Sequence, residues 1–280
     1  MKLMILDGNS VINRAFYGVR LLSTKDGLYT NAVYGFITIL LRLTEQEKPD
    51  ALCVAFDLKG PTFRHQRYEA YKAQRKGMPD ELAVQLPVLK DVLRAMNIPI
   101  FELEGYEADD IIGTCARLCS EKGDECVIVT GDKDSLQLIG EHVRVKLVST
   151  KMGQTGEKDI TKEQFEAEYG FEPIHMIDLK ALMGDASDNI PGVKGVGEKT
   201  AMSLIQQYRS IDRIYADIDA LELKDSVKKK LRDGEEMARL SYELATIDTH
   251  APVDINPENC RVQEPDREKL YDLFVKLEFN

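Results

Sequence analysis

The chain has 280 residues, of which 43% are hydrophobic and 30% are charged, a composition typical of a folded globular protein and not of a disordered one. Its apolar runs are far shorter than the ~20 residues that a membrane-spanning helix needs, and an aspartate at position 7 interrupts the first of them, which argues against a signal peptide. The formal net charge of −11 disfavours a nucleic-acid partner only if the acids are evenly spread, and nine clustered carboxylates account for most of it. Five cysteines without a Cys-x-x-Cys pair favour free thiols in a reducing cytoplasm.

Apolar runs and helical patterns alternate in the first part of the chain. Runs with strand character cover residues 2–6, 51–56 and 125–130, and a shorter apolar run covers residues 98–103. Apolar residues at helical spacing predict helices over 31–43, 80–96 and 111–118. This alternation predicts an α/β fold with a mostly parallel central sheet flanked by helices.

The second part of the chain is predicted to be mostly helical. A capping-box pattern at Thr161 opens one helix, and helical patterns follow over 174–183 and 199–208. We therefore expect an α/β core at 1–170, with a basic segment at about 59–80, and a helical part at 171–280, with a loop-and-helix motif at about 184–208.

Three of the strand-like runs end at or just before an aspartate, namely Asp7, Asp57 and Asp132. In an open parallel sheet the carboxyl ends of the strands share one edge, where ligands bind. The alternative for each residue is a cap on the helix that follows it. Three such residues on one edge favour a shared site.

A dense acidic stretch, Glu107-Ala108-Asp109-Asp110, opens the helix expected near residue 111. Neighbouring carboxylates raise one another's pKa and repel, although a solvated helix N-terminus is an alternative explanation, because acids there favour the helix dipole. Oxygen ligands without His or Cys suit Mg²⁺ or Mn²⁺, and the excess of acids suggests two ions. The alternative is a calcium-storage site, which would need an EF-hand loop that the sequence lacks. The candidate metal ligands are Asp7, Asp57, Glu107, Asp109, Asp110, Asp132, Asp134, Asp185 and Asp188.

Residues 59–76 combine six basic side chains with one acid and three interleaved aromatic rings. Cations bind phosphates and rings stack on bases, so this composition favours a nucleic-acid contact. Tyr68, Tyr71, Lys72 and Arg75 follow a helical spacing that would place them on one face. The alternative is a solvated surface helix whose tyrosines pack inward.

A glycine-rich loop with Gly192, Gly195 and Gly197 leads into the helix that contains Lys199. Backbone N–H groups at a helix N-terminus bind phosphate, and glycines permit its close approach. The loop differs from a nucleotide-binding P-loop, because Glu198 separates the last glycine from the lysine and no strand precedes it. We therefore expect the loop to bind a nucleic-acid backbone. The alternative is a plain helix–turn–helix corner without a ligand.

Taken together, these motifs resemble the 5′-nuclease domain of bacterial DNA polymerase I, a family that includes flap endonucleases and bacteriophage 5′-nucleases. The similarity extends over essentially the whole chain. It is carried by the segments LDGNS (6–10), TNAVYGF (30–36), EGYEADDI (104–111), VTGDKDSLQL (129–138) and LKALMGDASDNIPGVKGVGEKTA (179–201), together with the basic segment.

The resemblance implies a role for each candidate residue. Asp7, Asp57, Glu107, Asp109 and Asp110 would hold or support a first metal ion, Asp132 and Asp134 would bridge towards it, and Asp185 and Asp188 would complete a second site. Tyr71 would stack on a terminal base, while Lys72 and Arg75 would act with Asp132 in catalysis, Lys72 by stabilising the pentacovalent phosphate. Arg14 and Arg64 would be further DNA contacts. The loop from Gly192 to Lys199 matches the helix-two-turn-helix motif of the family, which would bind duplex DNA and could hold a K⁺.

The implied activity is a metal-dependent 5′→3′ exonuclease and flap endonuclease that cleaves nicked or branched DNA with a 5′ flap and RNA–DNA primers. A non-catalytic flap-binding module is the alternative from another class. We expect a bacterial, cytoplasmic and nucleoid-associated protein without membrane contact. The last residues, 277–280, fall where such a polymerase would continue, so the expectation is either an excised domain of a chain with a linked polymerase or a stand-alone nuclease.

Overall fold

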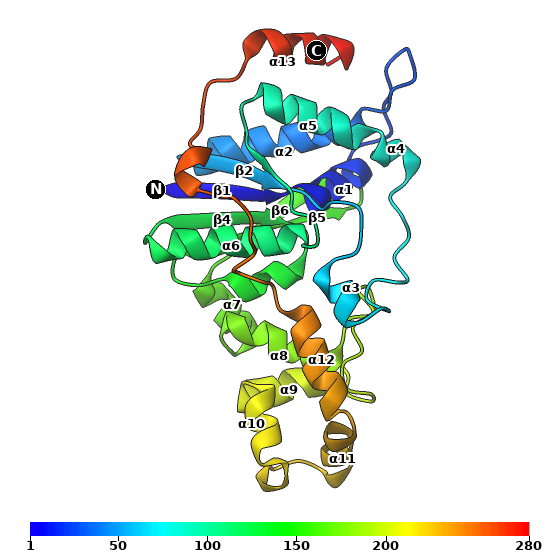
Figure 1. Cartoon of the computed structure of the whole chain (residues 1–280), viewed down its shortest axis with the longest axis vertical. Helices are drawn as coiled ribbons and strands as arrows, with labels where there is room; N and C mark the ends of the chain where they lie inside the picture. Colours follow the sequence, from blue (N-terminus) through cyan, green and yellow to red (C-terminus); the bar gives the residue numbers. More distant parts are fainter. Residues whose placement is uncertain (280) are drawn as a thin grey trace.

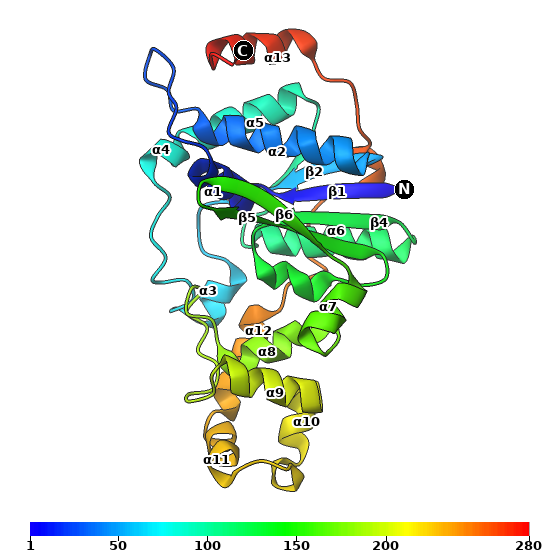
Figure 2. The same cartoon turned by 180° about the vertical axis from the view of Figure 1, so that it is seen from behind.

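The computed structural model describes residues 1–279 and centres on one six-stranded sheet (Figures 1 and 2). The strands are β1 (Lys2–Asp7), β2 (Ala51–Ala55), β3 (Ile100–Phe101), β4 (Glu125–Thr130), β5 (Val143–Lys151) and β6 (Gln154–Ile160). Their order is β3-β2-β1-β4-β5-β6, and only β6 runs antiparallel to its neighbour. The predicted α/β fold with a mostly parallel sheet is therefore confirmed.

Helices cover both faces of this sheet, which explains why its central strands are apolar throughout. Successive side chains of β1 point to opposite faces, so Leu3 and Ile5 join one buried core and Met4 and Leu6 join the other. The second core is closed by α1 (Gly8–Gly18), α2 (Asn31–Glu47) and α5 (Gln85–Ala95). The first is closed by α6 (Ala108–Glu121) and α7 (Lys162–Tyr169).

The first core continues without interruption into the helical part. Leu182, Leu204 and Leu231 belong to the same buried cluster as Leu3. The helical part holds α8 (Met176–Met183), α9 (Glu198–Tyr208), α10 (Ile211–Ala216), α11 (Asp225–Asp233) and α12 (Glu235–Ala245). Because the apolar cluster is shared, the helices around the glycine-rich loop are fixed to the α/β core by packing.

The last segment returns from the helical part to the far end of the molecule, where α13 (Arg267–Lys276) packs on α5 (Figure 1). On the way Arg261 forms a β-bridge with Ala51, and the Asn97 side-chain amide donates to the Glu264 carbonyl at 2.6 Å. Leu277 is buried in the second core. The two parts divided at residue 170 in the sequence are therefore not fully separate in space, because residues 246–279 of the second part pack on the α/β core.

Two helix predictions need correction. The pattern at 80–96 forms two helices, α4 (Asp80–Ala83) and α5, because Pro87 has no N–H to donate to the carbonyl of Ala83. The basic segment is helical only in α3 (Phe63–Arg67), and residues 69–74 form turns. The N–H groups of Tyr71, Ala73 and Arg75 donate to carbonyls three residues earlier, whereas the Lys72 N–H donates to the Asp188 carbonyl at 2.8 Å.

None of the helices within residues 1–279 combines the length and the apolar character that crossing a membrane would require.

Candidate functional site

The three strand-end aspartates meet because β1 lies between β2 and β4. Asp7 closes β1 opposite Ala55 of β2, and Leu6 pairs with Val129 of β4, so the three strands end at nearly the same level. Asp7, Asp57 and Asp132 line one cavity of about 740 Å³. The prediction that the strand-end aspartates share one crevice is therefore confirmed.

Hydrogen bonds hold these carboxylates in place. The Thr130 hydroxyl donates to Asp7 Oδ2 at 2.9 Å, and the Asp57 Oδ1 accepts the N–H of Ala108 at 2.7 Å. The second bond ties the end of β2 to the first turn of α6. The acidic stretch at the start of α6 thus becomes a wall of the same cavity, which Glu107 and Asp109 line.

The electrostatics of this wall are unfavourable without a cation. Burial and the neighbouring Asp57 raise the pKa of Asp7 to about 7, and burial with Asp132 and Asp7 nearby raises the pKa of Asp109 well above its usual range. Asp109 Oδ1 is also buried without a hydrogen-bond donor. A buried acceptor without a donor is costly, and a cation would satisfy it.

Glu107 differs, because cations already surround it. Arg64 Nη1 donates to Glu107 Oε2 at 2.6 Å, the Tyr71 hydroxyl donates to the same oxygen at 3.1 Å, and Lys72 contacts Oε1. Burial alone would raise the pKa of Glu107, but Lys72 and Arg64 lower it below the ordinary value. Lys72 thus lies directly beside the acidic wall.

Three site predictions disagree with this geometry. Arg64 is only 3% exposed and donates to Glu107 and Asp110, so it is a buried structural cation and not a DNA contact. Both Asp110 oxygens are taken by Arg64 and by the N–H groups of Glu107 and Asp248, so Asp110 supports the wall without offering an oxygen to an ion. Tyr71 is 4% exposed, so its ring has no free face for a base.

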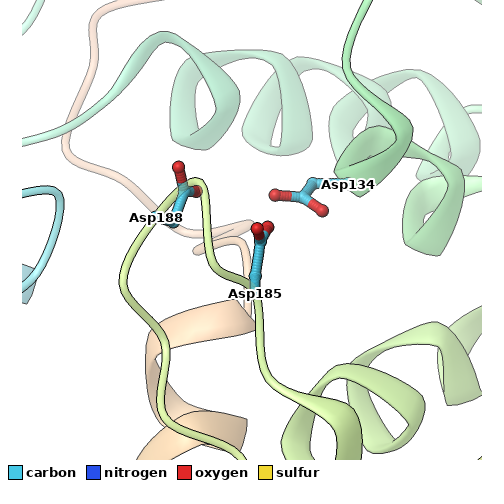
Figure 3. Close-up of side chains that lie close together, drawn as sticks. All are labelled: Asp134, Asp185 and Asp188. Carbon is cyan, nitrogen blue, oxygen red and sulfur yellow. The ribbon is translucent and has the colours of Figure 1, made fainter. Parts of the chain in front are cut away.

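A second acidic group adjoins the cavity and comprises Asp134, Asp185 and Asp188 (Figure 3). Arg75, which lines the cavity, contacts Asp188. One oxygen of each acid in the group lies within 4.8 Å of those of the other two, and the three side chains point toward one another. The group forms because Asp134 follows β4 while Asp185 and Asp188 flank a tight turn after α8, closed by a bridge between Asp185 and Ile190.

Side-chain cations neutralise this second group. Lys180 Nζ lies 2.7 Å from Asp185 Oδ2 and also contacts Asp134, while Arg75 contacts Asp188. Burial would raise the pKa of Asp185, but the bonds from Lys180 and Ser187 lower it to about 2. Burial and Asp132 raise the pKa of Asp134 to about 6 in spite of Lys180.

Lys180 is not among the site residues predicted from the sequence, although it lies within the LKALMGDASD segment, five residues before Asp185. Residues at i and i+4 share a helix face, and α8 ends at Met183, so Lys180 in its last turn is aimed at the loop that follows. That spacing was the available signal. Thr130, which donates to Asp7, gave no signal of its own within a strand-like run.

The glycine-rich loop makes close backbone contacts on the helical part. Gly192 has a φ of +63°, and a Cβ there would lie 2.3 Å from the Gly184 nitrogen, so only glycine fits. Gly195 has a φ of +84°, and Gly197 precedes α9 as its N-cap. Lys199 is exposed in the first turn of that helix.

Known proteins match the chain in both sequence and fold. Residues 2–170 match the family described as 5′-3′ exonuclease, N-terminal resolvase-like domain, and residues 171–268 match 5′-3′ exonuclease, C-terminal SAM fold. The chain belongs to the 5′-3′ exonuclease family. This agrees with the family suggested by the motifs.

Individual relatives in the family are bacterial DNA polymerases I. The chain is 48% identical over 279 residues to the enzyme of Caldicellulosiruptor bescii and 44% identical to that of Bacillus subtilis. It is covered completely in both comparisons but spans only 33% and 31% of the two relatives, about a third of their length.

Solved structures show the same fold. A T5 5′-exonuclease with bound zinc superposes with a TM-score of 0.71 at 22% identity, covering 99% of each chain. The catalytic core of Rad2 in complex with DNA substrate superposes with a TM-score of 0.64 at 17% identity, covering 99% of this chain and 88% of the other.

Proposed function

We propose that this chain is a structure-specific, divalent-metal-dependent 5′→3′ exonuclease and flap endonuclease. Family membership supports the class of reaction, and one observation supports the site: Asp109, in the acidic group that lines the cavity, has a buried Oδ1 without a hydrogen-bond donor among the described residues. The second acidic group adjoins the same cavity, because Arg75 lines it and contacts Asp188. The cavity lining contains no His or Cys, so its ligands suit hard cations such as Mg²⁺ or Mn²⁺.

Asp7, Asp57, Glu107 and Asp109 would hold the first ion, with Asp132 between the groups, and Asp134, Asp185 and Asp188 would hold the second. When bound, such ions activate a water molecule and neutralise the phosphate. Among the protein's own groups, Lys72 supplies a positive charge beside Glu107, and Arg75 supplies one beside Asp188. Both cations are placed to stabilise the charge that develops on a scissile phosphate.

The DNA duplex would lie on the helical part. Gly195 and Gly197 are exposed in the glycine-rich loop, and Lys199 follows in the first turn of α9. Gly192 is buried, and its N–H donates to Ser241 Oγ at 2.8 Å. Lys230 Nζ donates to the Gly195 carbonyl at 3.3 Å, so an ammonium group already lies at one carbonyl where a K⁺ could bind. Replacing K⁺ by Na⁺ in a duplex-binding titration tests this cation.

We further propose that the substrates are nicked or flapped DNA and RNA–DNA primers, as for a nuclease linked to a polymerase. The support is the identity of 44–48% to DNA polymerases I over the whole chain. A labelled primer with an RNA 5′ end, annealed next to an extended 3′ end, tests the class of substrate.

The main experiment incubates a labelled 5′-flap duplex with Mg²⁺, with EDTA, and with the Asp132→Ala variant. We expect cleavage in Mg²⁺ only, and a loss of several orders of magnitude in the variant. Asp272→Ala, an exposed aspartate on α13, is the matched control and should cleave normally. Cleavage that persists in EDTA would refute the metal mechanism, and binding without cleavage in any divalent ion would favour a flap-binding module.

A Lys72→Ala variant tests the role of the cation beside Glu107. We expect cleavage to slow by roughly 10²–10³-fold, as for removal of one electrostatic donor, with little change in substrate affinity. A defect confined to binding would contradict this role.

A further inference from the structure

The cations around the cavity fall into two groups. Lys72 and Arg75 contact carboxylates of the site. Arg14 on α1 and Lys133 after β4 line the same cavity, yet neither forms an ion pair with a carboxylate among residues 1–279. Their charge is therefore available to an anion that enters from that side.

An exposed aromatic ring lines the same cavity as these two cations. Tyr17 lines the cavity three residues after Arg14 on the same helix and is 59% exposed. Its ring meets Phe16 edge-to-face at 5.1 Å, so one edge is supported while most of the side chain faces solvent. A large exposed ring in a polar cavity contributes little to the core, and its free surface suits a flat partner.

The arrangement is fixed before any ligand binds. Arg14 Nη2 donates to the Gly131 carbonyl at 3.2 Å, and the Gly131 N–H donates to Ser10 Oγ at 2.8 Å, which locks α1 to the turn after β4. A Cβ at position 131 would lie 2.6 Å from Arg14 Nε. Glycine is therefore needed at this position to leave room for the arginine side chain.

We infer that Tyr17, Arg14 and Lys133 form a shelf for an unpaired nucleotide next to the cleaved phosphate. The ring would stack on the base, and the two cations would bind its phosphates. The ligand must be single-stranded at this point, because a base inside a duplex already has both faces stacked. This inference rests on the proposed nuclease function and adds residues for the unpaired part of its substrate.

The stacking is tested by measuring how tightly the protein binds a flap, so that the result does not depend on cleavage. A 5′ flap carrying 2-aminopurine next to the junction is titrated in Ca²⁺, which fills oxygen sites with looser geometry than Mg²⁺. Tyr17→Leu should weaken flap binding roughly 5- to 100-fold and abolish the quenching of the base, whereas Tyr17→Phe should restore both. Tyr271→Leu, an exposed tyrosine on α13, is the matched control and should behave as the wild type.

The same variants are titrated with a nicked duplex that has no unpaired nucleotide, to which Tyr17→Leu should bind normally. If Tyr17→Leu bound the flap as tightly as the wild type does, the shelf would be overturned. It would also be overturned if Tyr17→Leu lost the same affinity for the flap as for the nicked duplex. A wild type that neither binds nor cleaves the flap would instead overturn the proposed function.

The cationic part of the shelf has a separate test. Lys133→Ala should lower the slope of log K against log salt for the flap by about 0.7, the value for one phosphate contact on a single strand. Lys276→Ala, an exposed lysine on α13, is the control and should leave the slope unchanged. An unchanged slope for Lys133→Ala would remove this residue from the shelf.

Discussion

The two acidic groups of the site are balanced in different ways. Asp7 is buried, Asp109 is partly buried and Asp57 is exposed, and all three have a raised pKa. In the second group, Lys180 contacts two of the three carboxylates and Arg75 contacts the third. The pKa of Asp185 is therefore lowered to about 2, although burial keeps the pKa of Asp134 and Asp188 raised. The first group depends on external cations, while the second carries its own.

This difference suggests how the site is kept folded before ions bind. Crowded carboxylates without a neutralising cation cost stability, so the α/β core must offset that cost by packing on both faces of the sheet. In the second group, Lys180 and Arg75 offset the repulsion instead. Four predictions test the contrast.

The largest effect is expected for Asp109→Asn. Cleavage should fall by several orders of magnitude because a charged ligand is lost, while the metal-free protein should become more stable by at least ~1 kcal/mol at pH 8, because a buried charge is removed. Asp185→Asn should destabilise the metal-free protein, because it removes one of the two carboxylates that Lys180 contacts. Thermal unfolding in EDTA measures both, with Asp272→Asn as control; a destabilised Asp109→Asn would contradict the contrast.

Arg64 is the more deeply buried of the two cations that contact Glu107, and its loss should strongly affect stability. Arg64→Met would leave Glu107 and Asp110 buried without their main partner, which costs about 3–5 kcal/mol. The matched control is Arg67→Met on the same helix, where an exposed pair with Glu243 should cost less than ~1 kcal/mol. Similar urea midpoints for the two variants would refute the structural role given to Arg64.

The stability of the metal-free protein should depend on pH in the direction set by the first group. The folded-state pKa of Asp7 is about 7, above the ordinary 3.8, so the folded protein holds this proton longer than the unfolded chain. Stability is then highest below about pH 4 with respect to this group and falls by on the order of 2–4 kcal/mol as pH rises to about 7. Urea unfolding in EDTA measures the fall; Mg²⁺ should reduce it, and a rise over this range would contradict the assignment.

The fold was largely predictable because its signals are local. Apolar runs of strand length and helical spacing predicted β1, β2, β4 and most helices, and the capping box at Thr161 opens α7 as expected. The pattern at 68–75 was misleading, because its residues have helical spacing but do not form the series of backbone hydrogen bonds that a helix has. Asn189 Nδ2 donates to the Ala70 carbonyl at 2.7 Å, and such long-range backbone contacts leave no trace in local spacing.

The site was predictable in its acids but not in their partners. Strand-end aspartates converge by topology alone, so Asp7, Asp57 and Asp132 could be placed without coordinates. The different role of Asp110 could not be predicted in this way. It depends on Arg64 of α3, which donates to Asp110 in α6, and on the N–H of Asp248, which lies in the segment that returns to the α/β core. Charge counts treat all these carboxylates as equal, whereas burial and geometry distinguish them.

The smallest effect is expected for Lys180→Gln, which removes the internal cation shared by Asp134 and Asp185. Mg²⁺ should then bind the second group more tightly, roughly three- to tenfold, because it no longer competes with an ammonium group for the same oxygens. Calorimetric titration with Mg²⁺ measures the change, and Lys276→Gln is the control. Weaker Mg²⁺ binding in Lys180→Gln would show that the lysine orients these carboxylates more than it competes for them, and the second group would then depend on external cations as much as the first.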